Sequence, residues 1–215
     1  MVLMALYHFS FDLNQFGIIH ENMNHDPFWL NFRAVIMTLF LSLVGISFQF
    51  ARTEYKNKNY QKRLLKIFVC ALLISIATYF VDSRTWIFFG ILHLIFFASL
   101  LGPILNRFPL ISFLAGFAAI LLPIFYQNIF FMRPIWNLSG LSPIKPLTED
   151  FAPIFPWLGV VGIGVGIGAW FIKQKLNFGF DREIHLLTWL GQNSLVFYMT
   201  HQLILFPLAW LISRV

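Results

Sequence analysis

The stretch IFVCALLISIATYF (Ile67–Phe80) contains no charged residue over fourteen consecutive positions. A run this apolar is typical of a helix that crosses the hydrocarbon core of a membrane. The rest of the chain agrees, because 59% of its 215 residues are hydrophobic, only 11% are charged, and the mean hydropathy is +0.75. A soluble domain carries about 25% charged residues. The composition therefore predicts a polytopic membrane protein.

Seven stretches are long enough to cross, since a helix needs roughly 20 residues to span a hydrocarbon core about 30 Å thick. Backbone groups in lipid must be paired internally, so helices are favoured over strands. We expect an all-α fold, a polytopic transmembrane helical bundle of about seven helices, forming a single domain over residues 1–215. The expected spans are residues 1–19, 31–51, 65–81, 86–105, 108–131, 155–173 and 189–212.

The distribution of lysine and arginine predicts the orientation, because cytoplasmic loops carry an excess of both. With the N-terminus inside, the inner side holds ten of these residues and the outer side holds five. We therefore expect a cytoplasmic N-terminus and a C-terminus outside. The inner residues are Arg52, Lys56, Lys58, Lys62, Arg63, Lys66, Arg107, Lys173, Lys175 and Arg182, and the outer ones are Arg33, Arg84, Arg133, Lys145 and Arg214.

This distribution explains the net charge of +6 without any nucleic-acid partner. The basic segment RTEYKNKNYQKRLLK (Arg52–Lys66) has two interpretations that are compatible with each other. The favoured one is a cytoplasmic loop held near anionic lipid. The other is a landing site for a phosphate-bearing cofactor, with Arg52, Lys56, Lys62 and Arg63 as candidates.

A glycine-rich segment, GVVGIGVGIGA (Gly159–Ala169), matches a loose form of the dinucleotide-binding fingerprint. That fingerprint needs a preceding strand and a soluble α/β unit, and neither is expected here. Two glycine pairs in the segment are four residues apart, which is the spacing that lets membrane helices approach closely. We therefore predict that this segment packs against another helix.

The proline-rich loop over residues 132–155 is interpreted either as a lid or as a plain connector.

Ionisable residues occur inside several apolar stretches. His8 and Asp12 share one helix face because they are four positions apart. His93 and His201 lie in two other predicted spans, and Asn193 shares a helix face with His201. A charged residue in a membrane helix is costly and usually faces the interior of the bundle. We therefore expect a shared polar cavity, with Arg33 at its outer mouth.

Two histidines, His20 and His25, fall in the predicted outer loop HENMNHD after the first span. They stand five positions apart, whereas a zinc peptidase needs two histidines four apart, so we predict no metal site. A histidine at the water interface is suited to act as a general base. A solvated loop histidine without a role is an equal alternative. The single cysteine, Cys70, excludes an internal disulfide framework and a cysteine-based metal cluster.

Five segments, taken in order, carry a family resemblance: LMALYHFSFDLNQFG, DPFWLNFRAVIMTLFLSLVGIS, TWIFFGILHLIFFASLLG, DFAPIFPWLGVVGIG and LGQNSLVFYMTHQ. Together they resemble the heparan-α-glucosaminide N-acetyltransferase catalytic-domain family, in particular its short bacterial members. The resemblance covers nearly the whole chain. Its most specific pieces are the PWLG segment after Asp150 and the final segment from Gly191 to His201.

The resemblance implies an integral membrane acyltransferase of the bacterial inner membrane that uses cytosolic acetyl-CoA. The family's catalytic histidine lies on the outer side, with an asparagine about eleven residues before it, and Asn14 and His25 stand at that separation. Asp12 is a rival for the asparagine position and His20 for the histidine. His8 and Asp12 are further catalytic candidates close to the path of the acyl donor. The donor would pass His93, His201 and Asn193, which are candidates for binding it. The acceptor would be an amine or hydroxyl of an envelope sugar or glycolipid, reached near Arg33.

Family members usually begin further upstream with an acidic residue and Arg-Gly, so we expect either a late-annotated start or a missing part of the site. Two other function classes stay open. A proton-coupled transporter would use His8, Asp12, His93 and His201 as a relay. A non-catalytic membrane subunit is the third hypothesis. Membrane lipid is an expected partner in each case, and a homodimer is also considered.

Overall fold

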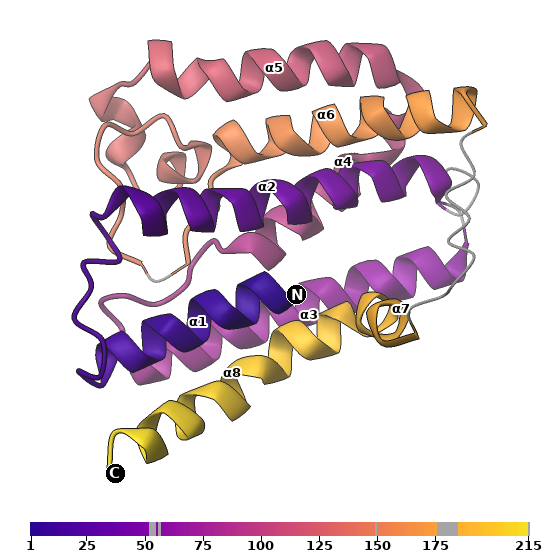
Figure 1. Cartoon of the computed structure of the whole chain (residues 1–215). Helices are drawn as coiled ribbons and strands as arrows, with labels where there is room; N and C mark the ends of the chain where they lie inside the picture. Colours follow the sequence, from indigo (N-terminus) through magenta and orange to yellow (C-terminus); the bar gives the residue numbers. More distant parts are fainter. Residues whose placement is uncertain (52–54, 56, 149, 176–184, 215) are drawn as a thin grey trace. The chain divides into compact units, whose positions relative to one another are not determined.

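The structure is a computed structural model that describes every residue except 52–54, 56, 149, 176–184 and 215. The described residues form eight α-helices and two short 3-10 helices and contain no strand (Figure 1). This confirms the predicted all-α fold. The elements are α1 (Val2–Gln15), α2 (Pro27–Phe50), α3 (Lys58–Val81), α4 (Ile91–Arg107), α5 (Pro109–Phe125), η1 (Ile129–Met132), η2 (Trp136–Ser139), α6 (Ile154–Lys173), α7 (His185–Gln192) and α8 (Ser194–Ile212).

Four of these helices, α2, α3, α6 and α8, are long and apolar enough to cross a membrane. They expose large apolar side chains that lipid can cover, such as Leu43, Phe80 and Leu203. The helices α4 and α5 are apolar but have only 17 residues each. The first predicted span is shorter than expected, because the 14 residues of α1 extend only about 21 Å at 1.5 Å per residue. The four long apolar helices nevertheless make the chain an integral membrane protein.

The chain divides into two compact units. Unit 1 contains residues 1–37 and 177–215, and unit 2 contains residues 38–176. The helix α2 begins in unit 1 and ends in unit 2. Each unit is described by itself below, and the single domain over residues 1–215 stays a prediction.

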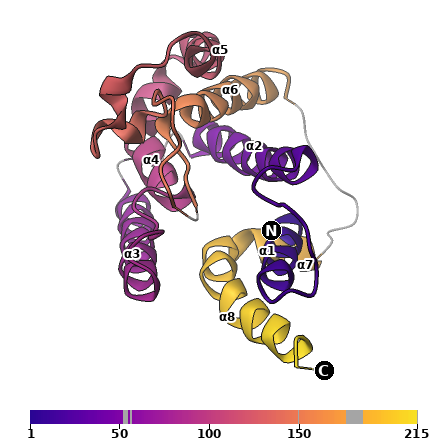
Figure 2. The same cartoon turned by 90° about the vertical axis from the view of Figure 1, so that its left-hand side faces the viewer.

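In unit 2, α5 and α6 lie side by side in both views (Figures 1 and 2). Glycines let their backbones approach closely. A Cβ added to Gly159 would lie 2.5 Å from the carbonyl oxygen of Gly116, and one added to Gly162 would lie 2.6 Å from that of Ser112. On another side of α6, a Cβ on Gly164 would meet the carbonyl of Ser42 in α2. The predicted packing role of the glycine-rich segment is confirmed.

Three helix boundaries in unit 2 differ from the predicted ones, each because of local capping. The helix α3 begins at Lys58 instead of residue 65, since the Asn57 side chain accepts a hydrogen bond from the Asn59 N–H and caps the helix. The helix α4 begins at Ile91 instead of residue 86, after an extended Gly90. The helix α5 ends at Phe125 instead of residue 131, and Asn128 then caps η1.

The segment between α5 and α6 is bound to the connection that precedes α4. The Thr148 hydroxyl donates to the Trp86 carbonyl at 2.8 Å, and the Ala152 N–H donates to the Phe89 carbonyl at 3.1 Å. The Ile91 N–H donates to the Asp150 carboxylate at 3.2 Å. These three bonds within unit 2 favour the connector interpretation of this loop over the lid.

In unit 1, α1 and α8 lie side by side (Figure 2). Three residue pairs define their register: His8 with His201, Asp12 with Gln202, and Phe16 with Phe206. Because residue numbers rise together in these pairs, the two helices run parallel. The pairing brings the two ends of the sequence into one unit and places polar groups between them.

Candidate functional site

The interface of α1 and α8 in unit 1 contains a buried carboxyl group. Asp12 is 1% exposed, and its Oδ1 accepts a hydrogen bond of 2.7 Å from the amide Nε2 of Gln202. The other carboxyl oxygen, Oδ2, is buried and has no hydrogen-bond partner among the described residues. The Gln202 oxygen Oε1 is also buried and has no hydrogen-bond partner among the described residues. Two buried acceptor atoms are therefore left unused beside the one hydrogen bond.

Two histidines pack against each other at the same interface. The rings of His8 and His201 meet edge to face with their centroids 5.0 Å apart, and His201 is 8% exposed. The His201 Nδ1 lies 2.7 Å from the carbonyl oxygen of Tyr198. A carbonyl can only accept, so Nδ1 carries the hydrogen and Nε2 of the neutral ring presents a lone pair. That Nε2 is buried and has no partner in the described part of the chain.

The loop after α1 is tied to this helix through Asn14. The Asn14 Oδ1 accepts a hydrogen bond of 2.8 Å from the Glu21 N–H, which leaves the amide Nδ2 as a donor. The side chains of His20 and His25 in this loop are exposed. The structure therefore attaches Asn14 to the loop that carries both candidate bases.

The start of α2 fixes the far end of this loop. The Asp26 carboxylate accepts a hydrogen bond of 2.7 Å from the Phe28 N–H, and Pro27 is the first residue of α2. Both residue types are typical of a helix start. Arg33, the predicted outer-mouth residue, lies half-buried in the second turn of α2. All of these groups belong to unit 1.

The basic segment lies in unit 2 at the start of α3. Lys62 and Arg63 are exposed in its first turns, and Lys58 and Lys66 lie on the same part of the helix. The N-terminus of a helix attracts anions, because unpaired N–H groups point outward and the helix dipole is positive there. Cationic side chains add to this attraction. Arg52 and Lys56, the other two candidates, lie outside the described residues.

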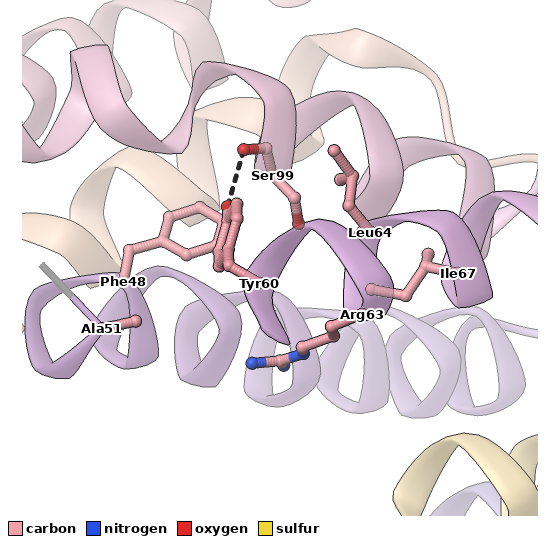
Figure 3. Close-up of a pocket in the computed structure, with 7 residues that line it drawn as sticks. All are labelled: Phe48, Ala51, Tyr60, Arg63, Leu64, Ile67 and Ser99. Atoms are coloured by element: carbon pink, nitrogen blue, oxygen red, sulfur yellow. Dashed lines mark hydrogen bonds between the residues drawn. The ribbon is translucent and has the colours of Figure 1, made fainter. Parts of the chain in front are cut away.

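A small surface pocket adjoins this segment (Figure 3) and is lined by Phe48, Ala51, Tyr60, Arg63, Leu64, Ile67 and Ser99. The Tyr60 hydroxyl donates to the Ser99 carbonyl at 2.8 Å, and the Arg63 guanidinium points away from that bond. Nearby, the Tyr55 hydroxyl donates to the Phe48 carbonyl at 3.0 Å, and burial raises the pKa of Tyr55. Hydrogen bonds therefore fix the two tyrosines in place, while Lys62 and Arg63 stay exposed.

His93 in unit 2 forms a cap on α4. Its Nδ1 accepts a hydrogen bond of 3.1 Å from the Gly90 N–H, so Nε2 carries the hydrogen and donates to the Ser75 hydroxyl at 3.0 Å. The Ser75 hydroxyl donates onward to the Ile87 carbonyl at 2.6 Å. Both ring nitrogens are therefore occupied by the fold. A cofactor-binding role for His93 stays a prediction.

The structure brings His8, Asp12 and His201 to one interface, and it joins Asn14 to the loop of His20 and His25. Asn193 precedes α8 and donates from its amide to the Trp189 carbonyl at 3.0 Å, as a helix-end contact. Gln202 was not predicted as a site residue. The available signal was a polar amide directly after His201 inside the apolar stretch 189–212.

The described residues contain no group of three or more histidine, cysteine or acidic side chains that could hold a metal ion. Comparison with protein families gives a match to the family model described as heparan-alpha-glucosaminide N-acetyltransferase, catalytic, over residues 1–203. Comparisons with curated proteins and with solved structures give no match. The family match covers α1 to α7 and about half of α8.

Proposed function

We propose that this chain, which belongs to the heparan-alpha-glucosaminide N-acetyltransferase catalytic-domain family, transfers an acetyl group from cytosolic acetyl-CoA to an amine or hydroxyl of an envelope sugar outside the membrane. The observation that carries the proposal is the extent of the family match, residues 1–203 of 215. The four long apolar helices support a reaction that takes place at a membrane. The proposed location is a bacterial inner membrane with the N-terminus in the cytoplasm.

The donor would bind at the cytoplasmic start of α3. Coenzyme A carries phosphate groups, and Lys62 and Arg63 are exposed cations in the first turns of that helix. An arginine guanidinium and a helix N-terminus both favour phosphate. We propose that Arg52 and Lys56, which precede α3 in the sequence, contribute to the same site. The thioester would then be carried through the bundle toward the outer side.

The acceptor would react beside the loop that follows α1. His25 is exposed there and would take the proton from the attacking amine or hydroxyl. The nucleophile forms a bond to the thioester carbonyl carbon, the carbon–sulfur bond breaks, and the sulfur leaves as coenzyme A thiolate, which is then protonated. The free Nδ2 of Asn14, or the guanidinium of Arg33, would stabilise the oxyanion. His20 is the alternative base.

The experiment uses full-length protein in proteoliposomes with labelled acetyl-CoA and a set of aminosugar and glycolipid acceptors. We expect labelled acetyl transfer by the wild type and a loss of roughly 10²- to 10⁴-fold in His25→Ala, as for removal of a general base. His20→Ala is the matched control, because His20 is exposed in the same loop. Loss in His20→Ala alone would reassign the base. No binding of acetyl-CoA at millimolar concentration would contradict the proposal.

A second candidate function, a proton-coupled carrier, is favoured by one observation, the buried Asp12 between α1 and α8. Buried acidic and histidine side chains in membrane helices often mark proton pathways. Uptake of a solute into proteoliposomes, driven by a pH gradient and lost in Asp12→Asn, would favour this function. Acetyl transfer without a requirement for a gradient would favour the acyltransferase.

A further inference from the structure

The interface of α1 and α8 presents three buried atoms that can only accept a hydrogen bond. They are Asp12 Oδ2, Gln202 Oε1 and His201 Nε2, and none has a partner among the described residues. Asp12 and His201 are 1% and 8% exposed, so water does not cover them at the surface. Buried polar atoms are nearly always paired in folded proteins. Three unpaired acceptors at one helix pair therefore point to a missing donor.

The charge of Asp12 is also uncompensated. Within the described residues, no lysine or arginine forms an ion pair with this carboxyl group, and its contact with Gln202 is to a neutral amide. Removing an isolated carboxylate from water costs a large amount of free energy. A buried acid therefore usually becomes neutral by holding a proton. A proton on Oδ2 would supply both missing properties, a positive charge and a hydrogen-bond donor.

We propose that Asp12 is a proton-binding site in unit 1, in which a proton on Oδ2 neutralises the buried carboxyl group beside Gln202 and His201. Two hydrogen bonds hold the site in place. The Gln202 amide holds Oδ1 of the carboxyl group, and the Tyr198 carbonyl fixes the His201 ring with Nε2 open.

The other titratable groups around this site are few. On α1, His8 contacts the His201 ring, and Tyr7 contacts His8. On α8, Tyr198 contacts His201. From α2, the aromatic side chains Trp29 and Phe32 contact Tyr7. The described side chains of α7, which packs on α8, include no titratable group. The described surroundings therefore offer Asp12 no cation, and the proton is expected on its carboxyl group.

One use of this proton rests on the proposed function. Acetyl transfer to an amine or hydroxyl moves one proton from the acceptor to the departing coenzyme A sulfur. A buried carboxyl group that takes up and releases a proton could carry it between the two. The proton site itself does not depend on that use, so the two statements are tested by different measurements.

The test for the site is infrared spectroscopy of the full-length protein in lipid nanodiscs at neutral pH. We expect a carbonyl stretching band of a protonated carboxyl group that shifts on ¹³C-labelling of aspartate and is lost in Asp12→Asn. Asp82→Asn is the control, because Asp82 is exposed and its carboxylate accepts hydrogen bonds from Arg84 and Thr85. A wild type without an aspartic acid band, or a band that survives in Asp12→Asn, would overturn the site.

If Asp12→Asn does not fold, the band is assigned in a protein that keeps Asp12 and replaces the other four aspartates, Asp26, Asp82, Asp150 and Asp181, by asparagine. Persistence of the band supports the site, and its loss overturns it. The use in catalysis predicts an acetylation rate at least tenfold lower in Asp12→Asn, with Asp82→Asn unchanged. An unchanged rate overturns the use. A wild type that binds acetyl-CoA but acetylates no acceptor counts against the proposed function, while the band still decides the site.

Discussion

The contact between α5 and α6 gives the most direct test of the fold. Gly162 of α6 is buried, and a Cβ there would lie 2.6 Å from the Ser112 carbonyl oxygen of α5. Gly191 of α7 offers a matched control, because a Cβ at that position meets nothing within 4 Å. The substitutions are Gly162→Ala and Gly191→Ala, which add the same methyl group to two helices.

Two opposing effects set the expected magnitude. Alanine is favoured over glycine by about 1 kcal/mol at an interior helix position such as Gly162, and by less at Gly191, which is the second-last residue of α7. At Gly162 the methyl group must also separate the helices by at least about 0.4 Å, since real Cβ contacts under 3.0 Å are essentially never seen. Overpacking of a filled core costs about 1–3 kcal/mol. The atoms that a Cβ at Gly162 would meet are backbone atoms, so we expect a cost near the upper end of this range. Gly191→Ala should be stabilising or neutral, and Gly162→Ala should be less stable than it by about 1–2 kcal/mol.

The measurement is reversible unfolding in mixed micelles, followed by circular dichroism as the denaturing detergent increases. The quantity compared is the difference between the two variants in the free energy of unfolding. If Gly162→Ala proves as stable as Gly191→Ala, the backbones of α5 and α6 do not approach as closely as the structure has them, and the packing argument fails.

Three further predictions follow from unit 1 and unit 2 separately. His93→Ala removes the cap of α4 and should cost about 1–3 kcal/mol of unfolding free energy; the dissociation constant for acetyl-CoA in a binding titration tests the predicted cofactor-binding role separately, because only that role would raise it. Charge reversal at Lys62 and Arg63 should raise that dissociation constant at least tenfold and leave the unfolding free energy within about 0.5 kcal/mol, and an unchanged constant would exclude the α3 site. A double-mutant cycle tests the Asp12–Gln202 hydrogen bond. Gln202→Leu should lower the free energy of unfolding by about 1–3 kcal/mol because it leaves Asp12 without a donor, and adding Asp12→Leu should recover most of that loss. If the effects of the two substitutions simply add, the two residues are not coupled.

Hydropathy alone predicted that the apolar stretches are helices, because every backbone group in lipid must find an intrahelical partner. The residues at which the helices begin and end could not be predicted in the same way. The residue Asn57 extends α3 into a basic segment that hydropathy excludes, and Gly90 with His93 delays the start of α4. Both effects depend on single side-chain hydrogen bonds, which an average over a window of residues cannot register. The helix α7 was not expected as a separate element for the same reason.

The candidate site was predictable in part. The i, i+4 spacing predicts a common face for His8 and Asp12, and both lie at the interface with α8. The partner of Asp12 was not predictable, because Gln202 is 190 residues away in sequence and is paired with it only by the register of α1 on α8. The tautomer of His201 likewise depends on the Tyr198 carbonyl. The convergence of His93 with these groups stays a prediction, since His93 belongs to unit 2.

The energetics of Asp12 indicate that it is retained for something other than stability. A carboxylate as deeply buried as that of Asp12, without a cation beside it, costs several kcal/mol. The hydrogen bond from Gln202 returns only about 0.6–1.7 kcal/mol on the measured scale for bonds between membrane helices. Leucine at both positions would pack the same helices with neither the cost of burying a carboxylate nor the gain from the hydrogen bond. A sequence under selection for stability alone would lose this pair, so its presence beside His201, with one carboxyl oxygen open, is best explained by proton binding at this interface.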